Sequence, residues 1–128
     1  MSPSAPPASA SAAAAVATGA VAGSSARWAA GEAFATGGFP WATLIVNLLG
    51  CAAIGWLAMR LERGTIAWYF AVTGCLGGLT TASAFAVESR QLLDDGRIVT
   101  ASIYVTTSVL GGLALVAATR HLAERVGR

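Results

Sequence analysis

The distribution of charge constrains the fold of this chain more than any other feature of its sequence. Only 11% of its 128 residues are charged and 55% are hydrophobic, whereas soluble domains carry about 25% charged residues. The charges leave four long uncharged stretches, 1–26, 41–59, 65–87 and 98–119. A helix of about 20 residues, rising 1.5 Å per residue, crosses the roughly 30 Å hydrocarbon core of a bilayer. The pattern predicts an all-α integral membrane protein with four transmembrane helices.

The expected helices follow these stretches and form a single membrane domain over residues 11–120. We place them at about 11–30, 41–60, 65–88 and 98–120. Three prolines among serine and alanine predict a disordered arm over residues 1–10, and the residues after the last helix, 121–128, are expected to form a polar tail. In the first helix, Gly19 and Gly23 form a GxxxG pair, which lets another helix approach closely.

The charged and nucleophilic groups exclude several classes of function. The net charge of +2 is scattered, whereas a nucleic-acid-binding protein presents a clustered basic face. The four stretches contain no carboxylate, lysine or histidine, so nothing in them relays protons or activates a nucleophile. The one histidine, His121, lies in the tail and has no second histidine with which to bind a metal. We therefore expect neither an enzyme nor a nucleic acid partner.

The arginines leave the orientation in the membrane nearly balanced. Five of them flank the side that would hold both termini and the 60–64 turn, and three flank the opposite side. Because arginine accumulates on the cytoplasmic side of membrane proteins, this difference favours cytoplasmic termini only slightly. Such a chain can insert in both orientations or pair with an oppositely oriented subunit. Arg27, on the opposite side, either anchors the end of the first helix at the interface or serves the function.

The third stretch contains a segment that disfavours a helix. Gly77 and Gly78 are followed, after one leucine, by Thr80 and Thr81, and glycine and threonine both have low helix propensity. A freed backbone group is costly in hydrocarbon, so a break there is tolerated mainly where the backbone faces protein or lines a site. The sequence predicts that the third helix is broken at its centre and that something binds or passes nearby.

The stretches also contain neutral hydrogen-bond donors. Asn47 lies near the centre of the second stretch, where an unpaired amide is costly, so it requires either an interhelical hydrogen bond or a ligand. Four hydroxyl groups accompany it, those of Thr81, Ser83, Tyr104 and Ser108. Donors without fixed charge suit a small anion, because they replace its hydration water without holding it too tightly. Phe85 either adds a positive ring edge to these donors or simply packs.

Several motifs in this chain resemble those of the small bacterial fluoride channels called Fluc or CrcB. The segment 43–50, TLIVNLLG, resembles the family's TLxVNxxG motif, and the segment 77–85, GGLTTASAF, resembles GGxTTFSTF. The segment 19–28, GAVAGSSARW, is similar to the glycine-rich pattern of the family's first helix. Single residues match in the same order further on, namely Glu88, Tyr104 and Ser108.

The resemblance implies an antiparallel, dual-topology dimer of two four-helix subunits, with pores through which cytoplasmic fluoride leaves passively across the bacterial plasma membrane. It implies a structural Na⁺ at the dimer interface, bound by the backbone carbonyls of Gly77 and Thr80. Arg27 and Glu88 would have structural roles. The residues to which it assigns fluoride-binding and pore roles are Asn47, Thr81, Ser83, Phe85, Tyr104 and Ser108.

One departure from the family pattern leaves the partner open. Ala82 and Ala84 replace one of its phenylalanines and one of its hydroxyl residues. The second subunit is therefore either an identical chain or a non-identical paralogue, and in the second case this chain is a non-conducting or half-competent partner in a heterodimeric channel. A small multidrug-type transporter also has four helices, but it needs an acidic residue in the first helix, and residues 1–26 contain none.

Overall fold

The computed structural model describes residues 9–35 and 37–127, and over this part helices are the only regular secondary structure. Two uninterrupted helices come first, α1 (Ala10–Ala33) and α2 (Trp41–Leu57). The third helical unit consists of α3 (Ile66–Trp68), a π-helical segment η1 (Tyr69–Leu76), α4 (Gly77–Leu79) and α5 (Ala82–Asp94). The fourth consists of α6 (Ile98–Thr106), a π-helical segment η2 (Thr107–Gly111) and α7 (Gly112–Val126).

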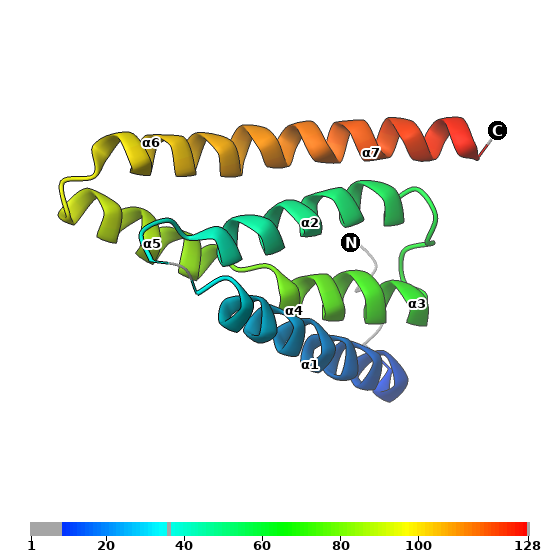
Figure 1. Ribbon diagram of the computed structural model, residues 1–128. Helices are drawn as coiled ribbons and strands as arrows, with labels where there is room; N and C mark the ends of the chain where they lie inside the picture. Colours follow the sequence, from blue (N-terminus) through cyan, green and yellow to red (C-terminus); the bar gives the residue numbers. More distant parts are fainter. Residues whose placement is uncertain (1–8, 36, 128) are drawn as a thin grey trace, which may run out of the picture.

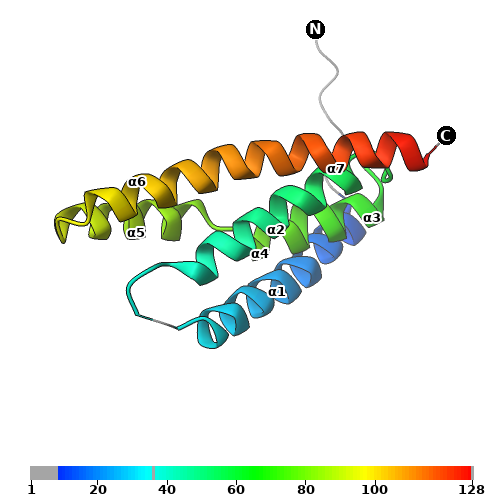
Figure 2. The same cartoon turned by 45° about the horizontal axis from the view of Figure 1, so that its top comes forward.

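The helices lie side by side in an elongated bundle. The fourth unit forms one long helix, and α2 packs along it (Figure 1), with Gly55 of α2 against Val116 and Thr119 of α7. Figure 2 shows α6 running back along α5 after a tight turn, in which Gly96 has φ 73°. The first turn of α1, the turn 58–65 and the last turn of α7 lie at one end, called here the terminal end (Figure 1).

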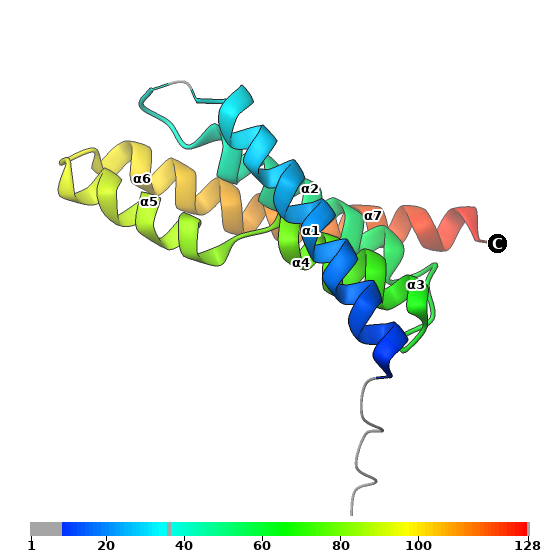
Figure 3. The same cartoon turned by 90° about the horizontal axis from the view of Figure 1, so that it is seen from below.

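Four glycines bring α1 against the third helical unit, which it crosses in Figure 3. A Cβ at Gly74 would lie 3.0 Å from the Cα of Gly19, and a Cβ at Gly78 would lie 3.0 Å from the N of Ser24. A Cβ at Gly23 would overlap the carbonyl of Cys75. The backbones therefore touch directly, and the packing role predicted for the GxxxG pair of α1 is confirmed.

The break in the third unit lies at the two threonines and not at the two glycines. Thr80 (φ −82°, ψ 155°) and Thr81 (φ −148°, ψ 118°) are extended, a conformation that suits β-branched residues. Gly77 and Gly78 are helical members of α4, and Gly78 serves the close contact with α1. The expected break is present, but the threonines produce it.

The helices extend beyond the uncharged stretches. α1 continues to Ala33, the third unit continues to Asp94, and α7 continues to Val126 through most of the expected polar tail, whereas α2 ends at Leu57, before residue 60. Charged residues do not end a helix that enters water, and i,i+4 ion pairs support the added turns. The described residues contain two such pairs, Arg90–Asp94 at 3.3 Å and Arg120–Glu124 at 3.2 Å. The expected arm over residues 1–10 lies almost wholly outside the described residues.

Two of the described helices have the length and hydropathy needed to span a membrane, Ile66–Asp94 and Ile98–Val126. α2 is apolar but shorter, with 17 residues. α1 consists largely of alanine, glycine and serine, which are less apolar than leucine or valine. Large apolar side chains face outward on these helices, for example Val99 at 73% exposure and Leu113 at 65%. This all-helical fold is that of a membrane protein whose outer surface contacts lipid.

The glycine contact between α1 and the third unit predicts a difference between two substitutions in the same helix. Gly23→Ala places a methyl group against backbone, which cannot move aside as a side chain can, and should lower the free energy of unfolding by about 1–3 kcal/mol. Gly31→Ala meets nothing within 4 Å and should be neutral or stabilising by up to about 1 kcal/mol. Thermal unfolding of both variants in detergent tests this, and equal stability of the two would contradict it.

Candidate functional site

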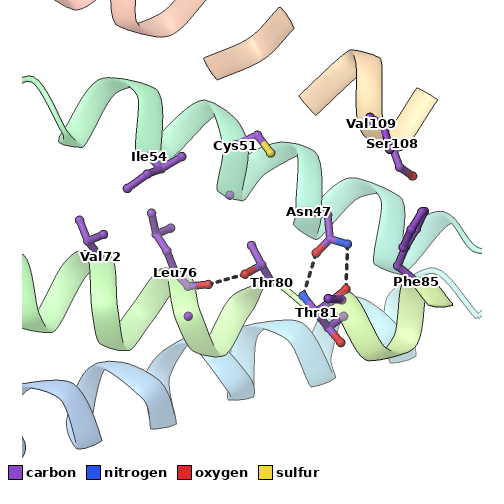
Figure 4. Close-up of a pocket in the computed structure, with 13 residues that line it drawn as sticks. Asn47, Cys51, Ile54, Val72, Leu76, Thr80, Thr81, Phe85, Ser108 and Val109 are labelled. Carbon is purple, nitrogen blue, oxygen red and sulfur yellow. Dashed lines mark hydrogen bonds between the residues drawn. The ribbon is translucent and has the colours of Figure 1, made fainter. Parts of the chain in front are cut away.

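A cavity of about 550 Å³ lies between α2 and the broken third unit, and η2 borders it (Figure 4). None of the residues that line it is charged. Six of the residues singled out in the sequence line this cavity, namely Asn47, Gly77, Thr80, Thr81, Phe85 and Ser108. Ser83 and Tyr104 do not line it. The structure therefore gathers most, but not all, of the predicted site in one place.

Asn47 pairs with the backbone of Thr81 at the break. Its Nδ2 donates to the Thr81 carbonyl at 3.0 Å, and the Thr81 N–H donates to its Oδ1 at 2.8 Å (Figure 4). In a continuous helix that N–H would bond to the carbonyl of Gly77. The side-chain amide of α2 thus replaces a backbone partner, and of the two possibilities for Asn47 the interhelical hydrogen bond is present. One amide hydrogen of Asn47 is left over for another acceptor.

The break leaves backbone carbonyls free. Leu76 accepts from both the N–H and the Oγ1 of Thr80, at 3.0 and 2.9 Å. The carbonyls of Gly77 and Thr80 accept no hydrogen bond from the described residues. Carbonyl oxygens are the donors that hard cations prefer, so these two groups fit a cation such as Na⁺ chemically.

The hydroxyl of Thr81 begins the next helix. It accepts from the N–H of Ala84 at 3.2 Å and so acts as the N-cap of α5. Ser83 Oγ lies 3.2 Å from the same hydroxyl, but the Ser83 residue is exposed. The Thr81 side chain therefore fixes the direction of α5, while its backbone is held by Asn47.

Glu88 is the centre of a second polar cluster. Its Oε1 accepts from Thr43 Oγ1 and its Oε2 accepts from Tyr104 Oη, both at 2.7 Å. Tyr104 is 0% exposed and packs against Phe85 and Phe39, with ring centroids 5.4 and 5.7 Å away. Tyr104 therefore binds the carboxylate from within the core. Sequence reasoning missed Thr43, although it lies one helical turn before Asn47 and shares its face of α2.

Arg27 borders a smaller cavity of about 370 Å³, together with Thr43, Thr81 and Glu88. It is half-buried and makes no ion pair with any carboxylate in residues 9–35 and 37–127. α1 continues six residues beyond Arg27, to Ala33, so Arg27 lies before the last turn of the helix. Thr81 lines both cavities and so lies between the smaller one, which contains Arg27 and Glu88, and the uncharged one.

The hydroxyl of Ser108 is buried without a hydrogen-bond partner in the described part of the chain. It belongs to η2 and borders the larger cavity (Figure 4). Buried polar atoms without a partner are rare, and π-helical turns are frequent at functional sites. An acceptor inside the cavity would satisfy this hydroxyl.

The double hydrogen bond of Asn47 predicts a loss of stability when the amide is removed. Asn47→Leu leaves the backbone of Thr81 unpaired at the break and should lower the free energy of unfolding by roughly 1–3 kcal/mol. Ser83→Ala, two residues further along on an exposed position, should change it by less than about 0.5 kcal/mol. Thermal unfolding in detergent measures both, and a neutral Asn47→Leu would contradict the role of the pair.

The comparisons with known proteins agree with this geometry. Residues 14–120 match the model of the family described as CrcB-like protein, Camphor Resistance (CrcB). A protein from Bordetella petrii named "Fluoride-specific ion channel FluC" is 44% identical over 108 residues, which are 80% of this chain and 84% of that protein. "Fluoride-specific ion channel FluC 1" from Streptomyces coelicolor is 42% identical over 122 residues, covering 87% of this chain and 76% of the relative.

A third relative, from Paracoccus denitrificans and also named "Fluoride-specific ion channel FluC", is 48% identical over 85 residues, covering 65% of this chain and 68% of its own length. These proteins are named as channels, and this agrees with the expectation that the chain is not an enzyme. Since the family model covers most of the sequence and the similar proteins extend along both chains, this chain belongs to the CrcB family.

Proposed function

We propose that this chain forms a fluoride-selective channel, through which fluoride that accumulates in the cytoplasm leaves passively across the bacterial plasma membrane. The names of its relatives support this substrate. The observation that carries the proposal is the unpartnered hydroxyl of Ser108 in a cavity lined only by uncharged residues. A small anion accepts hydrogen bonds there from neutral donors.

The two cavities provide successive environments for the anion. Arg27 makes the smaller cavity attractive to a negative ion. Glu88 lines the same cavity, and two hydroxyl donors fix the position of its carboxylate. At Thr81 the ion would pass into the larger cavity, where the spare amide hydrogen of Asn47, the Ser108 hydroxyl and the Phe85 ring edge replace its hydration water.

We propose that all four helical units cross the membrane. α1 packs along η1 and α4, so it lies at the same depth as a segment that is apolar enough to span. Its 24 residues, at 1.5 Å each, correspond to about 36 Å, and the 17 residues of α2 to about 26 Å. Tryptophans accompany the ends of these helices, as in the aromatic belts of membrane proteins, namely Trp28, Trp41, Trp56 and Trp68.

The proposed assembly is an antiparallel dimer with a Na⁺ at the interface. The free carbonyls of Gly77 and Thr80 border the larger cavity, and these would hold the ion, whose charge would neutralise their partial negative charges. The second subunit is an identical chain or a paralogue. Numbered names among the Streptomyces relatives, FluC 1 and FluC 2, favour the existence of such paralogues. A multidrug-type transporter has no support among the relatives.

Reconstitution of the purified chain in liposomes tests the proposed function directly. A fluoride electrode should record efflux of fluoride, with no comparable flux of chloride. Asn47→Ala and Ser108→Ala should each reduce fluoride flux by about tenfold or more, because a hydrogen bond to an ion is worth roughly 1.5–3 kcal/mol. Phe85→Ala removes the positive ring edge and should also reduce fluoride flux. Thr107→Ala, next to Ser108 but exposed, is the matched control and should conduct normally.

The outcomes of the flux experiment distinguish the alternatives. Flux by the chain alone supports a homodimeric channel. Flux only after co-reconstitution with a paralogue supports a half-competent subunit, whose own contribution is tested by placing the three variants in the mixed complex. If none of the three changes flux there, this chain is a non-conducting partner. Equal rates for fluoride and chloride would overturn the proposed selectivity.

The proposed Na⁺ predicts an ion-specific gain in thermal stability. A ligand that binds only the folded protein stabilises it increasingly as its concentration rises above Kd. The Tm in detergent should therefore rise with NaCl but not with CsCl at the same ionic strength, since Cs⁺ is too large for a site built from the same carbonyls. Identical Tm values in the two salts would speak against the site.

A further inference from the structure

The turn between α2 and α3 carries two arginines that are each stacked on a tryptophan. The Cζ of Arg60 lies 4.8 Å from the ring centroid of Trp56, and the Cζ of Arg63 lies 5.5 Å from that of Trp68. Trp56 belongs to the last turn of α2 and Trp68 to the first turn of the third unit. We call residues 60–65 the basic turn. A cation within about 6 Å of an indole face is attracted by the ring, so both guanidinium groups are preorganised.

Neither of these arginines is neutralised by a carboxylate of the described residues. The ion pairs there are Arg90–Asp94 and Arg120–Glu124, and Glu62, between the two arginines, makes none. Stacking occupies one face of a guanidinium and leaves the N–H donors at its edge free. Arg60 and Arg63 are exposed. They therefore present unused, fork-shaped donor groups on the outer surface.

The position of the basic turn determines which anion it can meet. It joins two apolar helices, and tryptophan at such positions lies at the level of the lipid headgroups. Arg120 lies at a similar level, because the preceding Thr119 touches Gly55 of α2. The anionic group of a bilayer at that depth is the phospholipid phosphate, which the planar guanidinium binds through two parallel hydrogen bonds.

The two ends of the molecule differ in charge. At the terminal end the described cationic residues outnumber the acidic ones, with Arg60, Arg63, Arg120 and Arg125 against Glu62 and Glu124. At the opposite end the balance is reversed, with Arg27, Arg90 and Arg97 against Glu32, Glu88, Asp94 and Asp95. The electrostatic field therefore favours an anionic headgroup at the terminal end.

We propose that the basic turn is a binding site for the phosphate of an anionic phospholipid, such as phosphatidylglycerol, held by the stacked guanidinium groups of Arg60 and Arg63. This inference rests on the chain lying in a membrane and not on fluoride conduction, so either proposal can fail without the other.

Native mass spectrometry of the full chain in detergent, with equal concentrations of phosphatidylglycerol and phosphatidylcholine, tests the site. The wild-type protein should prefer phosphatidylglycerol, and the Arg60→Gln/Arg63→Gln variant should lose roughly fivefold in that preference per arginine. The Arg60→Lys/Arg63→Lys variant keeps the positive charge but loses the planar, bidentate N–H donors. Its preference for phosphatidylglycerol should lie between those of the wild type and the glutamine variant. Arg90→Gln, at the opposite end, is the matched control and should leave the preference unchanged.

Three results would overturn the site. The first is an unchanged preference in the Arg60→Gln/Arg63→Gln variant, and the second is a lysine variant that binds as well as wild type. The third is displacement of phosphatidylglycerol by inorganic phosphate at matched ionic strength, which would mean that the turn binds a free anion. Both arginines are exposed, so the glutamine variant should keep the wild-type Tm, and this measurement shows that a lost preference does not come from misfolding.

Discussion

The hydrogen-bonded pair between the Asn47 amide and the Thr81 backbone is the interaction on which the rest of the site depends. A membrane helix cannot end in mid-bilayer unless its backbone groups find other partners. Asn47 provides these for Thr81, and the Thr81 hydroxyl then begins α5. Because the Thr81 N–H is held by α2, the carbonyl of Gly77 is free to serve another purpose. One side chain thus joins two helices, places Thr81 between the two cavities and exposes a polar backbone.

The surrounding charges are arranged so that the break remains uncharged. Glu88 is the carboxylate nearest in sequence to the break, and Thr43 and Tyr104 each donate a hydroxyl to one of its oxygens. These bonds fix the orientation of the carboxylate and leave its negative charge in place. Arg27 has no such partner among the described residues and contributes an attractive field in the smaller cavity. In the proposed route the ion meets Arg27 in the smaller cavity before it reaches the larger cavity, which is lined by neutral groups alone.

Much of this could be predicted from the sequence, because hydrocarbon restricts what a chain can do. The uncharged stretches predicted the helical units. Because an unpaired amide is costly in hydrocarbon, a partner for Asn47 was also expected. The helix ends could not be predicted from the charged residues. Arg120 and Glu124 end the uncharged stretch, but their ion pair also supports a helix that continues to Val126. Nor could the partners of Glu88 be predicted, since Tyr104 and Thr43 are 16 and 45 residues away in the chain. The break lies at the threonines and not at the glycines, where Gly78 packs against α1. Local helix propensity does not predict this tertiary contact.

The polar groups that border the larger cavity need partners, and this concerns the proposed second subunit. Lipid chains have no donors or acceptors, so an open side facing lipid would leave the Ser108 hydroxyl and the carbonyls of Gly77 and Thr80 unsatisfied in hydrocarbon. Water satisfies such groups only where protein encloses it. These groups therefore support the proposed second subunit, which would place another protein surface against this face. Ala82, exposed at the edge of the cavity, leaves room for a side chain of that second surface, and whether the partner is the same chain or a paralogue then decides which side chain fills it.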